Sequence, residues 1–314
     1  MIINTGNRTD IPAFYSRWFY NRIEEGSVLV RNPYNPQQVT RYLLDPALVD
    51  CIAFCTKNPQ PMISRLDRLD PFRQHWAVTI TPYEKDIEPF VPEPGRVMDA
   101  FCCLSERLGA KCVSWRYDPI FLTEKYDMDF HLRQFEHMAA QLAGYTDHCV
   151  ISFLDLYDKT RRNFPEGRAV SREDRLALGK AFVQIAAHYD MVIRPCGEGE
   201  ELAVLGADCG GCQSGEVMER AVGMPLRFPK SAQTREECSC ILGSDIGAYN
   251  TCGHGCLYCY ANYDRETVES NMKQHDPLSP FLIGDFMDGD VIKAAHQESW
   301  IEPQISFAEL LLNS

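Results

Sequence analysis

The stretch Val-Asp-Cys-Ile-Ala-Phe-Cys-Thr-Lys-Asn-Pro, residues 49–59, is an apolar run that ends in polar turn residues. Short runs of this kind, rich in Val, Ile and aromatic side chains, are typical of buried parallel strands. Five similar runs occur in the first 200 residues. The predicted strands are therefore residues 1–4, 49–54, 76–81, 111–115, 149–154 and 191–194.

Helical patterns lie between these runs, at residues 11–25, 96–108, 131–143 and 171–188. The first begins with Pro12, which suits a first helical turn, and the second and third show the i, i+3, i+4 apolar spacing of a surface helix. Residues 27–44 contain a Pro-Tyr-Asn-Pro turn and predict a hairpin or an extended flap.

Alternating strands and helices predict an α/β fold with a parallel sheet and right-handed crossovers. An open doubly wound sheet and a partial (β/α)6 TIM-like barrel both fit this alternation. No Gly-x-Gly-x-x-Gly follows the first strand, so the dinucleotide-binding version of the open sheet has no support. We favour the partial barrel.

The alternation stops after Glu200, and residues 201–314 are rich in glycine, proline and cysteine. A loop-rich stretch of this length needs a stabilising device other than a hydrophobic core, and metal ligation supplies one. We therefore expect a partial barrel over residues 1–200. A cysteine-rich, loop-rich, cluster-binding segment over residues 201–314 would close the barrel mouth.

The chain has 314 residues and a formal net charge of −13. This acidic balance argues against nucleic acid and anionic membranes as partners, because both require a positive surface. No apolar stretch approaches the ~20 residues of a membrane span, and the N-terminus lacks the features of a signal peptide. We expect a cytoplasmic protein, whose 14 cysteines are metal ligands or buried thiols rather than disulfides.

Six cysteines lie in apolar contexts, where a free thiol behaves as a small hydrophobic side chain. They are Cys51, Cys55, Cys102, Cys103, Cys112 and Cys149. We interpret these six as structural.

Three further cysteines lie in the run Thr-Cys-Gly-His-Gly-Cys-Leu-Tyr-Cys-Tyr-Ala-Asn, residues 251–262. Cys252, Cys256 and Cys259 have the spacing C-x3-C-x2-C, so that three thiolates on one loop can hold three irons of a [4Fe–4S] cluster and leave the fourth iron open. A zinc site of three cysteines and His254 is the alternative. His254 lies inside the same short loop, where tetrahedral closure would be strained, so we favour iron and sulfur.

A second, looser group contains Cys196, Cys209, Cys212, Cys238 and Cys240. A second [4Fe–4S] cluster and a structural zinc both fit, and unliganded thiols are the remaining alternative. The Cys-Ser-Cys spacing is too tight for an ordinary zinc knuckle and favours the cluster. The expected ligands are Cys196, Cys212, Cys238 and Cys240.

Polar residues follow the predicted strands, and in parallel α/β folds these carboxyl ends build the site. Three basic side chains there are suited to grip a carboxylate or phosphate: Arg8, Lys57 and Arg116. Three acidic ones are suited to ribose hydroxyls or an ammonium group: Asp10, Asp118 and Glu198.

The cysteine motif resembles that of the radical S-adenosylmethionine (SAM) superfamily, and the Tyr-Ala-Asn after it is similar to the version in spore photoproduct lyase. The whole chain resembles the bacterial DUF1848 proteins. The stretches that carry this likeness are residues 8–15, 28–36, 56–59 and 244–252. The motif follows the sixth predicted strand, whereas the superfamily carries it after the first, which resembles a permuted arrangement.

This resemblance implies that the open iron chelates SAM and that one-electron reduction, by a flavodoxin or a ferredoxin, gives methionine and a 5′-deoxyadenosyl radical. The radical would take a hydrogen atom from a small-molecule or peptide substrate. Tyr258 would lie beside the adenine, and Asn250 and Asn262 would hydrogen-bond the cluster sulfurs or SAM.

Two other classes of protein compete with this interpretation. A non-catalytic iron–sulfur or zinc protein would serve electron transfer or binding. A nucleic-acid repair enzyme, by analogy with spore photoproduct lyase, is opposed by the acidic net charge.

Overall fold

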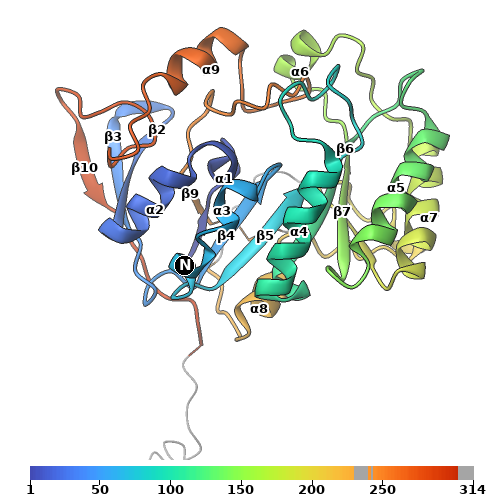
Figure 1. The fold of residues 1–314 in the computed structure, drawn as a ribbon, viewed down its shortest axis with the longest axis horizontal. Helices are drawn as coiled ribbons and strands as arrows, with labels where there is room; N and C mark the ends of the chain where they lie inside the picture. The colour runs from blue at the N-terminus through green and yellow to red at the C-terminus, as the bar shows by residue number, and fades with distance from the viewer. Residues whose placement is uncertain (230–239, 242, 303–314) are drawn as a thin grey trace, which may run out of the picture.

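The computed structural model describes residues 1–229, 240–241 and 243–302 of the 314-residue chain. Its larger sheet has seven strands, every neighbouring pair of which is parallel (Figure 1). Across the sheet the order is β8-β7-β6-β5-β4-β1-β9. The strands are β1 (Ile2–Asn4), β4 (Cys51–Thr56), β5 (Gln74–Thr79), β6 (Val113–Ile120), β7 (His148–Phe153), β8 (Val192–Pro195) and β9 (Ser244–Asp245).

Six of these strands coincide, within a few residues, with the six apolar runs of the sequence. The seventh, β9, was not predicted, because it has two residues and a polar sequence. It forms when Ser244 and Asp245 pair with Ile3 and Asn4 of β1. The segment after residue 200, expected to be irregular, therefore contributes an edge strand to the main sheet.

The helices are α1 (Ile11–Phe14), α2 (Ser16–Glu25), α3 (Gln60–Ile63), α4 (Pro94–Leu108), α5 (Met128–Leu142), α6 (Asp158–Asn163), α7 (Arg172–His188), α8 (Gly215–Val222) and α9 (Arg265–Met272). Three of them confirm predicted helices: α4, α5 and α7. Helix α4 packs against α3 and α5, and α5 packs against α7, which gives a helical layer along the sheet (Figure 1).

The predicted helix over residues 11–25 is two helices, because the backbone breaks at Tyr15, where φ is −128°. The Asp10 side chain caps the first helix by accepting a hydrogen bond from the Ala13 amide at 3.0 Å. The Tyr15 hydroxyl donates to the Thr251 carbonyl at 2.6 Å. Tyr15, at the break between the two helices, thus links them to the cysteine-rich loop.

Alternate residues of the strands pack on opposite faces of the sheet. Ile52 and Phe54 of β4 belong to the main core, which also contains buried side chains of the helices that follow the strands. Cys51 and Ala53, on the other face, belong to a smaller core with Val217 and other apolar residues of α8. Part of the cysteine-rich segment therefore covers the face of the sheet that the main core leaves free.

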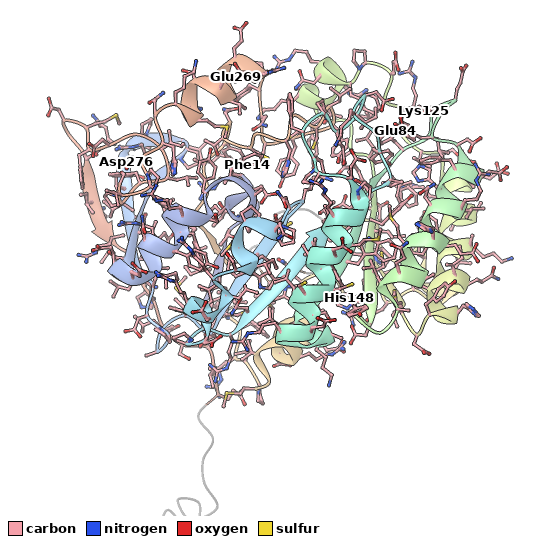
Figure 2. All side chains as sticks on the ribbon, viewed as in Figure 1. Phe14, Glu84, Lys125, His148, Glu269 and Asp276 are labelled. Atoms are coloured by element: carbon pink, nitrogen blue, oxygen red, sulfur yellow. The ribbon has the colours of Figure 1, made fainter. Side chains whose placement is uncertain are left out.

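Buried polar side chains also lie on this second face. His75 of β5, Ser114 of β6 and His148 of β7 form a hydrogen-bonded row, with nitrogen–oxygen distances of 2.8 and 2.7 Å. In the shared view of Figures 1 and 2, His148 is labelled low in the molecule and the cysteine-rich loop before α9 lies at the top. The row is therefore away from that loop. The row pairs the Ser114 hydroxyl with Nε2 of both histidines, whereas Nδ1 of His75 is buried without a hydrogen-bond partner among the described residues.

The smaller sheet contains β2 (Ser27–Asn32), β3 (Asn35–Leu43) and β10 (Val291–Ala294), in the order β10-β3-β2. Strands β2 and β3 are antiparallel and confirm the predicted hairpin. Strand β10 pairs in parallel with β3 and was not predicted.

The α/β class is confirmed, and its parallel sheet is flanked by helices. Within residues 1–229, 240–241 and 243–302 the larger sheet does not close, since β8 and β9 are its two edges, so a barrel is not confirmed. Leu202, Ile246 and Leu282 of the cysteine-rich segment belong to the same core as the strands of residues 1–200. No helix of the described ranges combines the length and the apolarity that crossing a bilayer requires.

The turn after β1 lies directly against the end of β4. A methyl group added to Gly6 would stand 2.2 Å from the carbonyl oxygen of Cys55, whereas one added to Gly95, in the first turn of α4, would have no heavy atom within 4 Å. We expect Gly6→Ala to lower the free energy of unfolding by about 3 kcal/mol. Gly95→Ala should leave it unchanged or raise it by up to about 1 kcal/mol. Urea titrations of both variants measure the difference, and equal effects would contradict this packing.

His131 of α5 is fully buried and hydrogen-bonded on both ring nitrogens. Nε2 lies 2.9 Å from the Phe121 carbonyl, which only accepts, so Nε2 carries the proton and Nδ1 accepts from the Tyr117 hydroxyl at 2.8 Å. Burial lowers the pKa of His131 to about 4 from an ordinary value of 6.5.

Because the folded protein binds this proton less tightly than the unfolded chain, the contribution of His131 is complete above pH 6.5. It is lost as the pH falls toward 4 and amounts to about 3 kcal/mol. His131→Gln keeps a donor and an acceptor, and its unfolding free energy should depend less on pH in this window. His137→Gln, at an exposed position of the same helix, is the control and should keep the wild-type slope. An unchanged slope in His131→Gln would refute the assignment.

Candidate functional site

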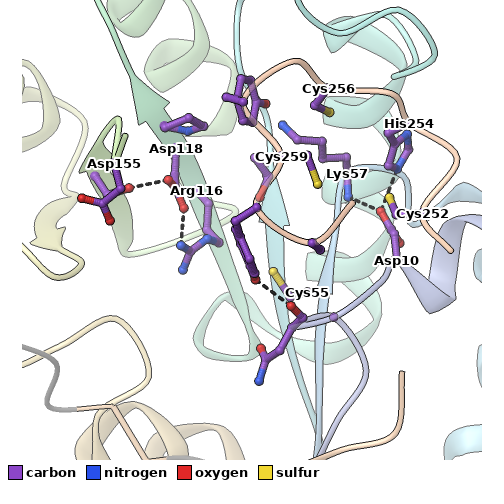
Figure 3. Close-up of a pocket in the computed structure, with 18 of the residues that line it drawn as sticks. Asp10, Cys55, Lys57, Arg116, Asp118, Asp155, Cys252, His254, Cys256 and Cys259 are labelled. Carbon is purple, nitrogen blue, oxygen red and sulfur yellow. Dashed lines mark hydrogen bonds and ion pairs between the residues drawn. The ribbon is translucent and has the colours of Figure 1, made fainter. Parts of the chain in front are cut away.

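A pocket of about 250 Å³ opens at the carboxyl ends of the parallel strands (Figure 3). Its lining comes from the turn after β1, the ends of β4, β5, β6 and β7, the residue after β8, and the loop of residues 252–261. Such an edge is where parallel α/β folds carry their sites. Five cysteines line it: Cys55, Cys196, Cys252, Cys256 and Cys259.

The cysteine-rich loop is fixed over the strand ends by main-chain hydrogen bonds. The Asn250 amide donates to the Ala261 carbonyl at 3.1 Å and closes the loop at its base. The Leu257 amide donates to the Ile87 carbonyl at 3.1 Å, and the Phe90 amide donates to the His254 carbonyl at the same distance. The loop is therefore anchored to the segment that follows β5.

Asn250 and Asn262 hold the loop rather than line the pocket. Asn250 has a positive φ of 57°, and its side-chain oxygen accepts from the Tyr263 amide at 2.6 Å. The Asn262 side chain donates to the Cys252 carbonyl at 2.8 Å. Its oxygen is buried and has no hydrogen-bond partner among the described residues. Neither side chain is among those that line the pocket.

Asp10 joins three segments beneath the loop. One carboxylate oxygen caps α1 and accepts from the Thr56 hydroxyl at 2.7 Å. The other accepts from the Lys57 amide at 2.8 Å and lies 2.8 Å from Nε2 of His254 (Figure 3). Phe14, central in Figure 2, packs edge-on against the His254 ring with centroids 4.7 Å apart. Asp10 thus uses both oxygens to position the loop.

Lys57 forms an ion pair with the buried Glu88 at 2.9 Å, and Thr81 and Tyr258 also donate hydroxyl hydrogen bonds to Glu88. The Lys57 ammonium lies 5.5 Å from the centre of the Tyr258 ring. Burial acts to lower the pKa of Lys57, but the charges of Glu88 and Cys256 and the hydrogen bond to Glu88 together outweigh burial, so the pKa is raised. Tyr258 is thereby fixed at the pocket wall.

The three loop cysteines surround Lys57 in Figure 3. Burial raises the pKa of each thiol, and the charge of Lys57 acts in the opposite direction on Cys256 and Cys259. Among the described residues, no three His, Cys, Asp or Glu side chains already stand in an arrangement that holds a metal ion. Metal binding at this loop therefore requires deprotonation and reorientation of the thiols.

Cys196, Cys212 and Cys240 meet at a second position. The Cys212 sulfur lies 3.2 Å from the sulfurs of both Cys196 and Cys240. Hydrogen bonds from the Cys212 and Cys240 thiols, together with the Arg116 charge, lower the pKa of Cys196. Cys209 is half-buried and contacts the main core instead. Cys238, also a predicted ligand, lies outside the described residues.

Arg116 lies between this second cysteine group and the strand end. It pairs with Asp118, which also accepts from the Ser152 hydroxyl, and it lies 3.9 Å from the Cys196 sulfur. Asp118 and Arg116 line the pocket, as do Asp10, Lys57 and Tyr258. Five of the nine residues predicted for cofactor binding are therefore at the pocket.

Arg8 and Glu198 have other partners and do not line the pocket. Arg8 pairs with Asp245 at 2.7 Å and links the turn after β1 to β9. Glu198 accepts from the Phe153 amide at 2.7 Å and lies 3.3 Å from Arg175 of α7. Burial raises its pKa to about 7. Both residues brace strand ends.

Two residues of the site were not expected from the sequence: Cys55, which lines the pocket, and Glu88, which contacts the lining residues Lys57 and Tyr258. Cys55 was interpreted as structural, but it lies one residue before the end of β4 on the face that Cys51 and Ala53 share, and it lines the pocket. The one sequence signal for this position is the alternation of side chains along the strand, which places Cys55 on the same face as Cys51 and Ala53. Glu88 follows β5 in an irregular segment, and no sequence pattern links it to Lys57 or Tyr258.

The Asp10 carboxylate is expected to be a major source of stability. Asp10→Asn replaces one acceptor oxygen by an amide that faces hydrogen-bond donors, so we expect a loss of about 3 kcal/mol in the free energy of unfolding. Asp264→Asn is a matched control, because Asp264 caps α9 through the Thr267 amide at an exposed site and Asn caps equally well. Denaturant unfolding followed by tryptophan fluorescence compares them. Equal losses would show that Asp10 is only a helix cap.

A family model described as "Domain of unknown function (DUF1848)" matches residues 2–261, which include every strand of the larger sheet and the whole cysteine motif. No curated protein matches the chain.

Proposed function

The chain belongs to the DUF1848 family, and we propose that it is a radical SAM enzyme of non-standard architecture that acts on a small molecule or a peptide. The observation that supports this most directly is that Cys252, Cys256 and Cys259 line one pocket at the carboxyl ends of a parallel sheet. The proposal includes a cytoplasmic location and a flavodoxin or ferredoxin as the electron donor.

The residues present suit a [4Fe–4S] cluster. Three thiols come from a single loop, and that loop is anchored at both ends and in its middle by hydrogen bonds. The side-chain oxygen of Asn262 and Nδ1 of His254 are buried polar atoms of the same loop, and neither has a hydrogen-bond partner within the part of the chain that the structure describes. A bound cluster with SAM would supply one-electron cleavage of SAM, which gives the 5′-deoxyadenosyl radical.

The chain's own residues would bind and orient these groups. Glu88 fixes the Tyr258 ring through its hydroxyl, so that the ring presents a flat apolar surface for an adenine. Lys57 offsets the negative charge that three metal-bound thiolates bring into the pocket. Arg116 and Asp118 of β6 supply one cation and one carboxylate to the pocket wall. Water would be excluded by the loop itself.

We also interpret the larger sheet as part of a barrel. From β1 the strands β4, β5, β6, β7 and β8 are neighbours in chain order, as in a singly wound barrel, whereas a doubly wound sheet reverses direction at a switch point. The second face carries α8 and the row from His75 to His148, which would then form the barrel interior.

One observation favours a second candidate function, a non-catalytic iron–sulfur protein for electron transfer or binding. Cys55 and Cys196 line the same pocket as the loop cysteines and offer a fourth thiolate. A cluster with four protein ligands has no open iron for SAM.

Anaerobic reconstitution with iron and sulfide, followed by EPR of the reduced protein, tests the proposal. We expect a [4Fe–4S]⁺ signal that changes when SAM is added and 5′-deoxyadenosine among the products. Cys256→Ser should lose the signal, and Cys103→Ser, at an exposed position of α4, should keep it. Because the fourth iron is expected to be open, Cys55→Ser should also keep both signal and SAM response.

Two outcomes would contradict the proposal. A cluster signal that is indifferent to SAM, and that Cys55→Ser abolishes, would establish the four-ligand electron carrier. Uptake of zinc by the loop cysteines without iron would establish a metal-stabilised binding protein.

A further inference from the structure

The thiols of Cys196, Cys212 and Cys240 come from three separate segments. Cys196 directly follows β8, Cys212 lies in the turn that enters α8, and Cys240 stands four residues before β9. The segments are also joined by a hydrogen bond from the Ile241 amide to the Gln213 carbonyl, 2.8 Å long. Strands β8 and β9 are the two edges of the larger sheet. The three thiols therefore lie where the segments that adjoin its opposite edges meet.

The sulfur spacing distinguishes between the species that three thiols can form. A disulfide requires about 2.05 Å between sulfurs. A tetrahedral ion with metal–sulfur bonds of about 2.3 Å places its sulfurs about 3.8 Å apart. A [4Fe–4S] cubane attaches each thiolate to a different iron and separates the sulfurs further. The three described thiols do not yet stand in an arrangement that holds an ion, and their observed distances of 3.2 Å need the smallest adjustment, about 0.6 Å, to reach the single-ion spacing.

The surroundings also favour ligation by thiolates. Arg116 donates toward the Cys196 sulfur at 3.9 Å, and the guanidinium stays charged at every physiological pH. Cys212 is 5 % exposed, so its thiolate would be protected from solvent, whereas Cys196 faces the pocket. An ion at this position would therefore lie at the pocket wall.

We propose that Cys196, Cys212 and Cys240 bind one thiophilic divalent ion of the zinc class, which ties the two edges of the larger sheet together beside the pocket. Binding releases the thiol protons and forms three metal–sulfur bonds, with no change in oxidation state. A single ion at this site differs from the second iron–sulfur cluster that we favoured from the sequence. It does not depend on the proposed function of the loop of residues 252–259.

The test uses the full chain, stripped of metal under reducing conditions and titrated with Co²⁺. Co²⁺ takes the place of zinc and shows thiolate-to-metal absorption bands. We expect the bands to saturate at one equivalent for this site in a Cys256→Ser background, where the loop motif is disabled. Cys240→Ser and Cys212→Ser, each in that background, should lose the bands, and Cys209→Ser should keep them. Zinc should raise the unfolding temperature of the Cys209→Ser control by about 5 °C and that of Cys240→Ser much less.

Both Cys240→Ser and Cys212→Ser are used, so that a folding defect in one variant does not decide the result. Cys240 is less buried than Cys212, and Cys240→Ser replaces a single half-buried atom, so it is the milder change. Bands that survive both serine variants would overturn the proposal. So would a four-iron cluster that Cys212→Ser abolishes, or a disulfide between these cysteines in the protein purified without reductant. Failure of the EPR experiment on the loop would leave these outcomes unchanged, which separates the two sites.

Discussion

The carboxylate of Asp10 is the interaction on which the arrangement of the site depends. It is almost fully buried, and its two oxygens are shared among the first turn of α1, the end of β4 and His254 of the cysteine-rich loop. A buried charge is tolerated only when hydrogen bonds replace its hydration. Asp10 therefore requires all three segments to be in place together, and this requirement positions a loop more than 240 residues away in the chain over the strand ends.

The charges around the pocket obey the same rule, that a buried charge needs a partner. Glu88 neutralises Lys57 and fixes Tyr258, and Asp118 neutralises Arg116. The two cations lie next to two different groups of cysteines, Lys57 beside the loop and Arg116 beside Cys196. In the proposed metal-bound state the thiolates would add negative charge to a protein that already carries −13, and these two cations lie where they would offset it.

The elements with strong local patterns were predictable. Apolar runs gave six strands, and amphipathic spacing gave α4, α5 and α7, since both signals arise within a few neighbouring residues. Strand-end position also led to Asp10, Lys57, Arg116 and Asp118, because parallel strands bring their carboxyl ends to one edge. Arg8 and Glu198 obeyed the same rule and yet lie outside the pocket, since Asp245 and Arg175 engage them.

The sequence by itself determined the α/β class, the hairpin of β2 and β3, the family likeness and the two groups of cysteines as candidate ligands. Only the tertiary structure decided that the described strands leave the larger sheet open, that β9 and β10 complete the two sheets, that Cys55 lines the pocket and that Glu88 contacts Lys57 and Tyr258. The physical reason is the range of the interactions. Hydrophobic period and motif spacing are properties of adjacent residues, whereas a two-residue edge strand, an ion pair across 31 residues and three thiols from separate segments exist only once distant parts of the chain are packed together.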